Sequence, residues 1–263
     1  MIPGRYISEW KEQVLWPGDA QVELDLVITR AIIAIFSDAY LSSSLAFRGG
    51  TALHKLFTQP GARFSEDIDL VQIQPGPIGP VIDQLREVLG FIESTRINVD
   101  RNIFMTTLNY RFQGEDSMAP VMKLKVEINC REHGYVFPRY IKSVHIDNSW
   151  FTGEAGVVTY QLEELLGTKL RALYQRSKGR DLFDLWYAMT QLVTDTDRLL
   201  FAFKEYTRIA GTEIAKVDFL ENLELKAQDK KFRNDIEGLI KPGLKYDFER
   251  AYDLVVSELV SKI

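Results

Sequence analysis

Apolar residues recur at intervals of three and four over Asp19–Asp38, which predicts the first long helix of the chain. Asp19 is the expected N-cap, because a short acidic side chain can accept hydrogen bonds from the first free backbone N–H groups. Shorter helical patterns follow over Ala52–Phe57 and Val81–Leu89, with a break at Pro60-Gly61 between them. The apolar face of the first helix comprises Leu24, Val27, Ile28, Ala31, Ile32 and Ile35.

Alternation of apolar and polar residues predicts strands in the same part of the chain. The alternation is strict in Met122–Ile128, so that its apolar side chains point to one face and its charged side chains to the other. Most apolar residues of Phe104–Phe112 also fall at one parity, and Ile68–Val71 is a shorter strand candidate. The charged residues of the first of these strands are Lys123, Lys125 and Glu127.

After about Gly156 the pattern changes to long helical repeats. The sequence therefore predicts a mixed α/β front part, residues 1–155, and a helical back part, residues 156–263. Gly179 is expected to end the first of the back helices, because glycine commonly follows the last helical turn. The helical patterns cover Gln161–Ser177, Asp181–Leu192, Arg198–Ile209, Leu223–Phe232 and Tyr246–Val260.

Composition narrows the class of protein. Hydrophobic residues make up 46% and charged residues 26% of the chain, which is typical of a globular protein. The net charge of −5 argues against a globally basic nucleic-acid coat protein, although it permits a local basic patch. The single cysteine, Cys130, excludes an internal disulfide and a Cys-based zinc cluster. With no bilayer-length apolar run and no signal-peptide pattern, a cytoplasmic protein that does not enter the membrane is expected.

Two carboxylates lie at the start of the Ile68–Val71 strand. Asp67 and Asp69 are two residues apart, so an extended backbone places both on one face. Like charges this close repel each other unless a cation lies between them, and hard oxygen ligands at this spacing suit Mg²⁺ together with substrate phosphates. The alternative is a solvated acidic strand end without a ligand.

Glu127 extends this hypothesis to a third carboxylate. If the Met122–Ile128 strand pairs beside Ile68–Val71, Glu127 completes a cluster able to hold two metal ions for in-line phosphoryl chemistry. The alternative is an ion pair between Glu127 and Lys125 or Lys123 on an exposed face.

A glycine-rich turn, Gly49-Gly50-Thr51, precedes the acidic strand. Glycines let the backbone approach a phosphate closely, and the free N–H groups at a helix start attract anions. The turn fits neither the P-loop nor the dinucleotide-binding fingerprint, which argues against ATPase and Rossmann interpretations. Arg48 and Lys55 flank it and are expected to add positive charge.

The back part contributes a lysine and two aspartates. Lys169 borders the apolar stripe of its helix, so its side chain must reach solvent, meet an anion or lose its proton. Asp181 and Asp184 share a face of the next helix. Basic residues are concentrated in this segment, which is expected of a site that binds the phosphates of a nucleotide or an RNA. The alternative is an ordinary charged turn exposed to solvent. The basic residues of the segment are Lys169, Arg171, Arg176, Lys178 and Arg180.

These blocks, taken in order, resemble the AbiEii family of nucleotidyltransferase-like toxins, the group that includes the MenT toxins of mycobacteria. The resemblance implies an α+β fold: a DNA-polymerase-β-like core with a mixed sheet flanked by helices, followed by a helical C-terminal lobe that carries Lys169 and Asp184. The matching blocks are Phe47–Leu56, Arg63–Leu70, Lys123–Asn129, Glu163–Leu173 and Arg180–Leu185.

The resemblance also implies a chemistry. Mg²⁺ or Mn²⁺ on Asp67 and Asp69 would bridge the phosphates of an NTP, Lys169 would neutralise triphosphate charge, and pyrophosphate would leave. Asp184 would orient Lys169 or the acceptor. Ser65 matches a hydroxyl residue beside the metal site that a cognate antitoxin can modify in some relatives. The expected nucleotide-binding residues are Arg48, Gly49, Gly50, Thr51, Ser65 and Lys169, the expected metal ligands Asp67, Asp69 and Glu127, and the expected catalytic residues Asp67, Asp69, Lys169 and Asp184.

The function implied is that of a toxin in a toxin–antitoxin or abortive-infection pair. It would transfer NMP from an NTP to an RNA acceptor, the 3′ end of tRNA, and so inhibit translation and growth. A cognate antitoxin encoded next to the toxin is expected, and the acidic net charge favours a small RNA footprint over a DNA duplex. Two rivals stay open: an AMP- or phosphotransferase acting on a protein hydroxyl, and a nucleotide- or partner-binding module without turnover.

Overall fold

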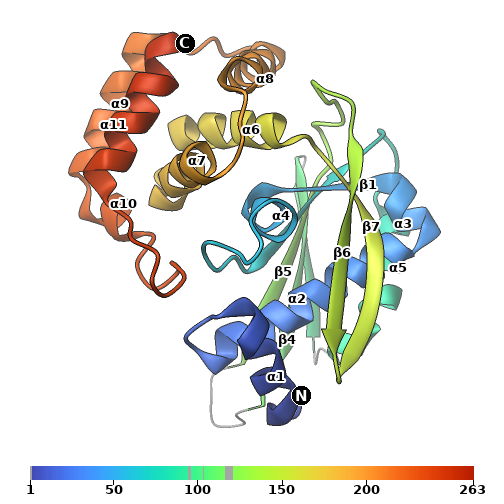
Figure 1. Ribbon diagram of the computed structural model, residues 1–263. Helices are drawn as coiled ribbons and strands as arrows, with labels where there is room; N and C mark the ends of the chain where they lie inside the picture. The colour runs from blue at the N-terminus through green and yellow to red at the C-terminus, as the bar shows by residue number, and fades with distance from the viewer. Residues whose placement is uncertain (1, 94–95, 103, 116–120) are drawn as a thin grey trace. The chain divides into compact units, whose positions relative to one another are not determined.

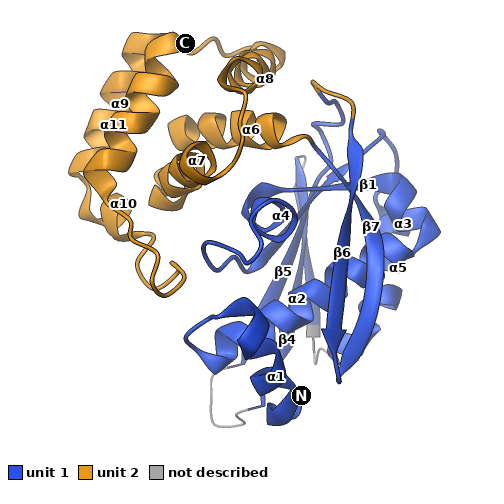
Figure 2. Ribbon diagram, in the orientation of Figure 1, with its two compact units in different colours: residues 1–135, 139–160 blue, residues 136–138, 161–263 orange. Residues whose placement is uncertain are grey.

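The computed structural model describes residues 2–93, 96–102, 104–115 and 121–263. The chain forms two compact units (Figure 2). Unit 1 comprises residues 1–135 and 139–160, and unit 2 comprises residues 136–138 and 161–263. Unit 1 contains the β-sheet, whereas the long elements of unit 2 are helices (Figure 1).

Unit 1 is built on a mixed sheet, which has seven strands in the part of the chain that the structure describes, in the order β3-β4-β5-β2-β1-β7-β6. The β2–β5 and β1–β7 pairs are parallel, and the other neighbours are antiparallel. The strands are β1 (Leu45–Arg48), β2 (Asp67–Gln72), β3 (Arg96–Arg101), β4 (Met105–Phe112), β5 (Met122–Asn129), β6 (Tyr140–Asn148) and β7 (Phe151–Thr159).

The two faces of this sheet differ in polarity. On β5, Leu124, Val126 and Ile128 are fully buried. Lys125 and Glu127 alternate with them and lie on the opposite face. The long helix α2 packs against β5, β6 and β7 and crosses the sheet in Figure 1. Burial of one apolar face therefore leaves the other face of these strands polar. The helices of unit 1 are α1 (Gly4–Val14), α2 (Asp19–Ser37), α3 (Ala39–Ser44), α4 (Gly49–Leu56) and α5 (Gly79–Val88).

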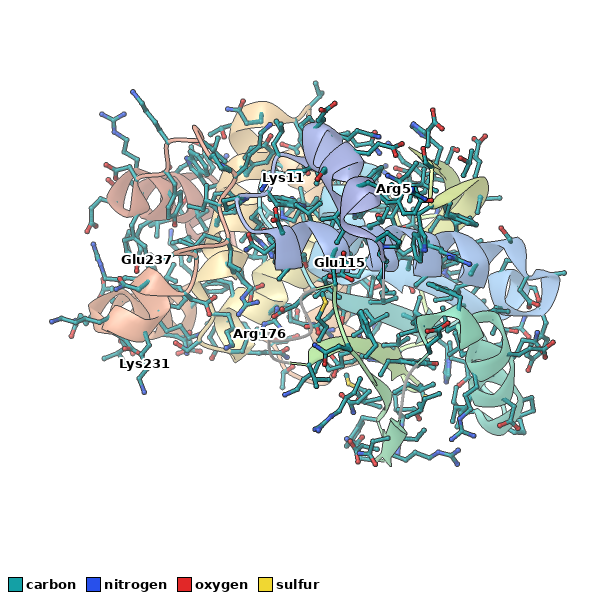
Figure 3. The ribbon with its side chains drawn as sticks, turned by 90° about the horizontal axis from the view of Figure 1, so that it is seen from below. Arg5, Lys11, Glu115, Arg176, Lys231 and Glu237 are labelled. Carbon is teal, nitrogen blue, oxygen red and sulfur yellow. The ribbon has the colours of Figure 1, made fainter. Side chains whose placement is uncertain are left out.

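The N-terminal helix α1 joins this unit through its buried side chains and several polar contacts. Ile7 and Trp10 are its buried residues. The backbone N–H of Gly4 donates to Oε1 of Glu115 at 3.1 Å, and Lys11 forms an ion pair with Asp19 at 2.6 Å. Figure 3 labels Glu115 and Lys11. The second contact joins exposed side chains and contributes little to stability.

Unit 2 is a set of helices packed around apolar stripes. On α6, the stripe is fully buried at Leu166, Leu170 and Leu173, and it packs against α7 and α8. Gly167 allows the close approach of α8, because a Cβ atom there would lie 2.9 Å from the backbone nitrogen of Phe203. The helices of unit 2 are α6 (Leu162–Gln175), α7 (Gly179–Gln191), α8 (Thr196–Ile209), α9 (Lys216–Gln228), α10 (Lys230–Asn234) and α11 (Phe248–Glu258).

The predicted fold class, a mixed sheet with helices and a helical C-terminal region, is confirmed. Two local predictions are wrong. Gly179 begins α7 instead of ending α6, and it is glycine because a Cβ atom there would lie 2.0 Å from the carbonyl oxygen of Phe232. Asp19 is the first helical residue of α2, and Gly18 is its N-cap.

The division into functional domains at residue 155 stays a prediction. None of the helices in the described ranges is long and apolar enough to cross a membrane.

Candidate active site

Strand β2 places the two predicted carboxylates on the polar face of the sheet. Asp67 and Asp69 alternate with buried Ile68 and Leu70, which anchor the strand in the core. The parallel register pairs Asp67 with Lys125 of β5 and Asp69 with Glu127. Since paired residues of neighbouring strands share a face, the structure brings the three predicted carboxylates together around one lysine.

Lys125 lies between two of these carboxylates. Its Nζ is 3.6 Å from Oδ2 of Asp67 and 3.0 Å from Oε2 of Glu127. Burial raises the pKa of the Asp67 carboxyl to about 6. Lys125 opposes this rise, and Asp69 and Glu127 add to it. The pair predicted between Glu127 and Lys125 is thus present, within a cluster where negative charge exceeds positive charge.

The turn between β1 and α4 brings backbone against this cluster. Gly49 has a φ of 82°, a left-handed conformation that favours glycine. A Cβ atom on Gly49 would lie 2.0 Å from Oδ2 of Asp69. Gly49 therefore supplies both the turn and the space for the Asp69 carboxylate. The N–H groups at the start of α4 consequently lie beside the acidic strand.

Two hydroxyl groups tie the same turn to β2. The Thr51 and Ser65 hydroxyls are hydrogen-bonded at 2.8 Å, and the Thr51 hydroxyl donates to the Asp67 carbonyl oxygen. Thr51 is buried, with 1% of its surface exposed. Its side chain therefore holds the glycine turn and the first residue of the acidic strand in a fixed relation.

A buried arginine lies beneath Gly50. Arg63 is 2% exposed, and its Nη1 donates to the Phe64 carbonyl oxygen at 3.0 Å. A Cβ atom on Gly50 would lie 2.5 Å from Nη2 of Arg63. Positive charge thus lies directly behind the glycine turn. Arg63 opens the block Arg63–Leu70 of the family resemblance, but no role was predicted for its side chain.

Arg48 occupies the end of β1 beside Asp69. The antiparallel register pairs the two residues, and Nη1 of Arg48 donates to Oε2 of Glu132 at 2.8 Å. Burial acts to lower the pKa of Arg48, but the charge of Glu132 and its hydrogen bond outweigh this effect and raise it. Arg48 is therefore a fixed cation at the edge of the candidate site.

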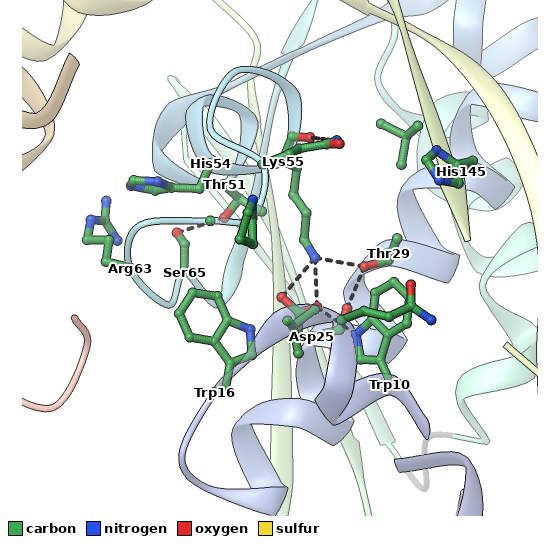
Figure 4. Close-up of a pocket in the computed structure, with 16 residues that line it drawn as sticks. Trp10, Trp16, Asp25, Thr29, Thr51, His54, Lys55, Arg63, Ser65 and His145 are labelled. Atoms are coloured by element: carbon green, nitrogen blue, oxygen red, sulfur yellow. Dashed lines mark hydrogen bonds and ion pairs between the residues drawn. The ribbon is translucent and has the colours of Figure 1, made fainter. Parts of the chain in front are cut away.

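Lys55 was expected to add positive charge to the glycine turn, but its ammonium group binds elsewhere. Its Nζ contacts both carboxylate oxygens of Asp25 at 2.8 Å and Thr29 at 2.8 Å (Figure 4). Lys55 follows Thr51 by one helical turn on α4, and a buried carboxylate on α2 attracts it. This ion pair lines a cavity of about 330 Å³, whose wall also includes Thr51 and Ser65.

The other predicted site residues lie in unit 2 and form a buried ionic cluster. Nζ of Lys169 is 3.0 Å from Oδ1 of Asp181 and 3.0 Å from Oδ2 of Asp184. Lys169 is 7% exposed, and both aspartates are fully buried. Arg176 donates to both oxygens of Asp181 at 2.7 and 2.9 Å. Burial acts to raise the pKa of Asp181, but Lys169 and Arg176 outweigh it and lower the pKa.

The cluster decides between the alternatives left open for Lys169, because its ammonium group meets two anions. Lys169 does not extend into solvent along the helix surface, and Asp181 joins Asp184 as its partner. The spacing of the two aspartates on one helix face was the available signal for this. Arg180 pairs with Asp235 at 2.9 Å, and Lys178 lies 3.8 Å from the same carboxylate. Internal carboxylates therefore balance much of the positive charge predicted for phosphates.

Metal binding is tested by the donor set on β2 and β5. Among the described residues, no group of three or more His, Cys, Asp or Glu side chains is arranged to hold a metal ion. Burial raises the pKa of the Asp67 carboxyl, and the charge of Asp69 on the same face adds to the rise, so a bound cation would oppose both effects. Mg²⁺ is commonly bound by one or two carboxylates plus substrate phosphates. Asp67 and Asp69 fit that requirement, and Glu127 as a third ligand stays a prediction.

Comparison with solved structures places this fold. The MenT4 nucleotidyltransferase toxin of Mycobacterium tuberculosis matches with a TM-score of 0.63 at 17% identity, over 99% of this chain and 88% of that chain. JHP933 of Helicobacter pylori matches with a TM-score of 0.57 at 18% identity, over 93% of both chains. These two matches show that the chain shares the fold of these proteins.

The family is identified from the sequence. The family described as "Nucleotidyl transferase AbiEii toxin, Type IV TA system" matches residues 30–254. The chain belongs to this family of nucleotidyltransferase toxins of toxin–antitoxin systems. No curated protein matches the chain significantly.

Proposed function

We propose that the protein transfers NMP from an NTP to the 3′ end of an RNA, with tRNA as the acceptor, in a reaction that depends on Mg²⁺ or Mn²⁺. The observation that carries the proposal is the seating of Gly49 against Asp69. It places the anion-attracting start of α4 beside the carboxylate pair of β2. A triphosphate and its cation can therefore be bound at one place in unit 1.

The glycine turn would bind the triphosphate through backbone N–H groups. Gly49, Gly50 and Thr51 supply this backbone at the start of α4, and Arg48 and Arg63 add positive charge around it. Ser65 would act through its hydrogen bond to Thr51. These groups are fixed before substrate binds, so little reorganisation is needed when charge develops.

Asp67 and Asp69 would hold the cation, with Glu127 as a third ligand on the neighbouring strand. When bound, Mg²⁺ supplies charge neutralisation at the phosphates. The acceptor hydroxyl oxygen forms a bond to the α-phosphorus, and the bond from that phosphorus to the α–β bridging oxygen breaks. The hydroxyl proton passes to solvent or to a carboxylate of the cluster, and pyrophosphate leaves.

Lys169 and Asp184 enter this proposal as a positioned pair. Lys169 would meet triphosphate charge, and Asp184, 3.0 Å from its Nζ, would orient it. Asp181 would fix the same ammonium from the other side. The two carboxylates, each 3.0 Å from Nζ, would keep the ammonium group in a fixed position.

Inhibition of translation follows from modification of a tRNA end, because a blocked acceptor end cannot be aminoacylated. Such a toxin needs a cognate antitoxin, which we place in a neighbouring gene. The net charge of −5 favours a small RNA footprint over a long duplex. We place its action in the cytoplasm, where tRNA and NTPs are found.

The proposal is tested by incubating the protein with Mg²⁺, total bacterial tRNA and each α-labelled NTP in turn. Label on tRNA from one NTP, lost in Asp67→Ala, is the expected result. Glu66→Gln is the matched control, because Glu66 is an exposed carboxylate next to Asp67 in the sequence and precedes β2. Label that stays on protein after RNase treatment would replace the RNA acceptor with a protein hydroxyl. NTP binding without any transfer would indicate a binding module.

A further inference from the structure

A polar groove lies on the same sheet face as the candidate active site, within unit 1. It has a volume of about 400 Å³, within the range of ligand-binding clefts. Strands β3, β4 and β5 each contribute to its lining. The lining residues are Asn98, Asp100, Asn109, Arg111 and Lys123.

The register of the strands connects this groove to the carboxylates of β2. Asp67 pairs with Lys125, and Lys125 pairs in turn with Asn109 of β4. Asn109 pairs with Asn98 of β3. Neighbouring strands lie about 4.8 Å apart, so the groove begins roughly 10 Å from Asp67 across the sheet. A ligand that fills the groove therefore reaches the site where the proposed reaction occurs.

The groove presents two kinds of chemistry. Arg111 and Lys123 pair across β4 and β5, and both side chains are exposed. Two adjacent cations on a sheet face attract phosphate groups. The other side of the groove is polar, and there the amides of Asn98 and Asn109 donate hydrogen bonds to the carboxylate of Asp100.

The hydrogen bonds of Asp100 orient both amides. Nδ2 of Asn98 donates to the Asp100 carboxylate at 3.1 and 3.2 Å, and Nδ2 of Asn109 donates to it at 3.2 Å. A carboxylate can only accept, so the two amide oxygens are left to accept from a ligand. Amide oxygens accept hydrogen bonds from the exocyclic amino groups of cytosine and adenine, which uracil lacks.

We propose that this groove binds the single-stranded 3′ end of the acceptor RNA, with backbone phosphate on Lys123 and Arg111 and amino-bearing bases against Asn98 and Asn109. The inference rests on the proposed function and names the part of the acceptor that is recognised. It assigns a preference for C or A over U in the nucleotides next to the reacting hydroxyl. A single strand is required because its base edges are free to reach the asparagines.

Binding of a short labelled RNA, followed by fluorescence anisotropy, tests this groove without requiring turnover. The full chain is used without NTP, and the single strands end in CCA or in UUU. Lys123→Glu is expected to weaken binding about tenfold, the effect of losing one charge-assisted contact. It should also reduce the salt dependence of binding. Asn98→Ala with Asn109→Ala should bring the CCA and UUU affinities together.

Arg101→Glu is the matched control. Arg101 is exposed on β3, the strand of Asn98, but it pairs with Thr106 and so lies on the other face of the sheet. Equal loss of binding in Lys123→Glu and Arg101→Glu would overturn the proposal that RNA binds in this groove. A preference for CCA that survives the double asparagine substitution would overturn it as well. Circular dichroism of each variant identifies any that fails to fold, and Lys123→Gln then replaces Lys123→Glu.

Transfer assays separate the two levels of the proposal. Wild-type transfer to RNA, with an acceptor KM unchanged in Lys123→Glu, would overturn the groove and leave the proposed function standing. Absence of wild-type transfer to any RNA would overturn the proposed function and, with it, the acceptor assignment. A raised acceptor KM in Lys123→Glu at unchanged NTP KM is the result that the groove predicts.

Discussion

A Cβ atom on Gly49 would lie 2.0 Å from Oδ2 of Asp69 and 2.8 Å from its Cβ. The backbone of the glycine turn and the side chain of Asp69 are therefore in tight contact, so a displacement of the turn would displace the carboxylate as well. A sequence places these residues in separate motifs. Their contact places backbone N–H groups, which attract anions, next to a carboxylate, which attracts cations.

Gly49→Ala is expected to destabilise the fold and to remove most activity. The left-handed φ of 82° costs an alanine about 1–2 kcal/mol, and the clash displaces the Asp69 carboxylate. Urea denaturation and NTP-dependent transfer measure the two effects. Gly79→Ala is the control, because no atom lies within 4 Å of a Cβ atom there. A Gly49→Ala protein as active as Gly79→Ala would contradict the proposed seating.

The Asp67 carboxyl predicts an unusual pH dependence of stability. Its pKa is raised from 3.8 to about 6, chiefly by burial, so the folded protein holds a proton that the unfolded chain releases. Without metal, this group therefore lowers the free energy of unfolding as pH rises from about 4 to about 6. Asp67→Asn should then be more stable than the wild type at pH 7, and this gain should vanish near pH 4.

Chelator-treated wild type and Asp67→Asn, unfolded in urea at several pH values, provide the measurement. Addition of Mg²⁺ should stabilise the wild type more than Asp67→Asn, because a cation compensates the carboxylate. A stability difference that grows as pH falls would have the wrong sign and would refute the assignment of the raised pKa to Asp67.

The cluster around Lys169 makes a prediction about stability in unit 2. Lys169→Met leaves Asp181 and Asp184 buried without this cation and should lower the free energy of unfolding by about 3–5 kcal/mol. Adding Asp184→Asn should recover part of the loss, because one buried negative charge is removed. Lys204→Met, at an exposed position on α8, is the control and should change stability little. Equal free energies of unfolding for Lys169→Met and Lys204→Met would show that the cluster does not stabilise the fold.

The hydroxyl of Thr51 connects the glycine turn to β2, and its removal is expected to lower the stability of the fold. Thr51→Val keeps the side-chain shape but removes the hydrogen bonds to Ser65 and to the Asp67 carbonyl oxygen. Loss of a buried hydroxyl partner costs about 1–3 kcal/mol. Thr51→Ser retains the hydroxyl and should retain most of the stability. Thermal unfolding of the wild type and the two variants measures this effect. Equal unfolding temperatures of Thr51→Val and Thr51→Ser would contradict it.

The sequence was most informative where the hydrophobic pattern had a single period. Strict alternation over Met122–Ile128 placed Lys125 and Glu127 on one face, and β5 confirms this. The parallel pairing of Asp69 with Glu127 was only a conditional expectation, because register depends on contacts far apart in the chain. The strands β3, β6 and β7 were not predicted. Along β6 only Val144, Ile146 and Asn148 are buried, so its apolar signal is weak.

Side-chain direction was harder to predict than secondary structure. Lys55 follows the glycine turn in sequence, yet it pairs with Asp25 on another helix, which sequence proximity does not reveal. Lys169 was recognised at the border of an apolar stripe, but its partners come from the next helix. Arg63 lies in a block of the family resemblance, but the block does not reveal its packing against Gly50, and the groove over β3–β5 had no local pattern. Long-range packing therefore decided which charged groups face the candidate site.

The central claim is that the carboxylates of β2 support nucleotidyl transfer to an RNA end. The most direct measurement compares pyrophosphate released with label joined to RNA, for wild type, Asp69→Asn and Glu66→Gln. The claim predicts one pyrophosphate for each nucleotide joined in wild type and Glu66→Gln, with both signals lost in Asp69→Asn. Full joining by Asp69→Asn, or label on RNA without pyrophosphate, would contradict it.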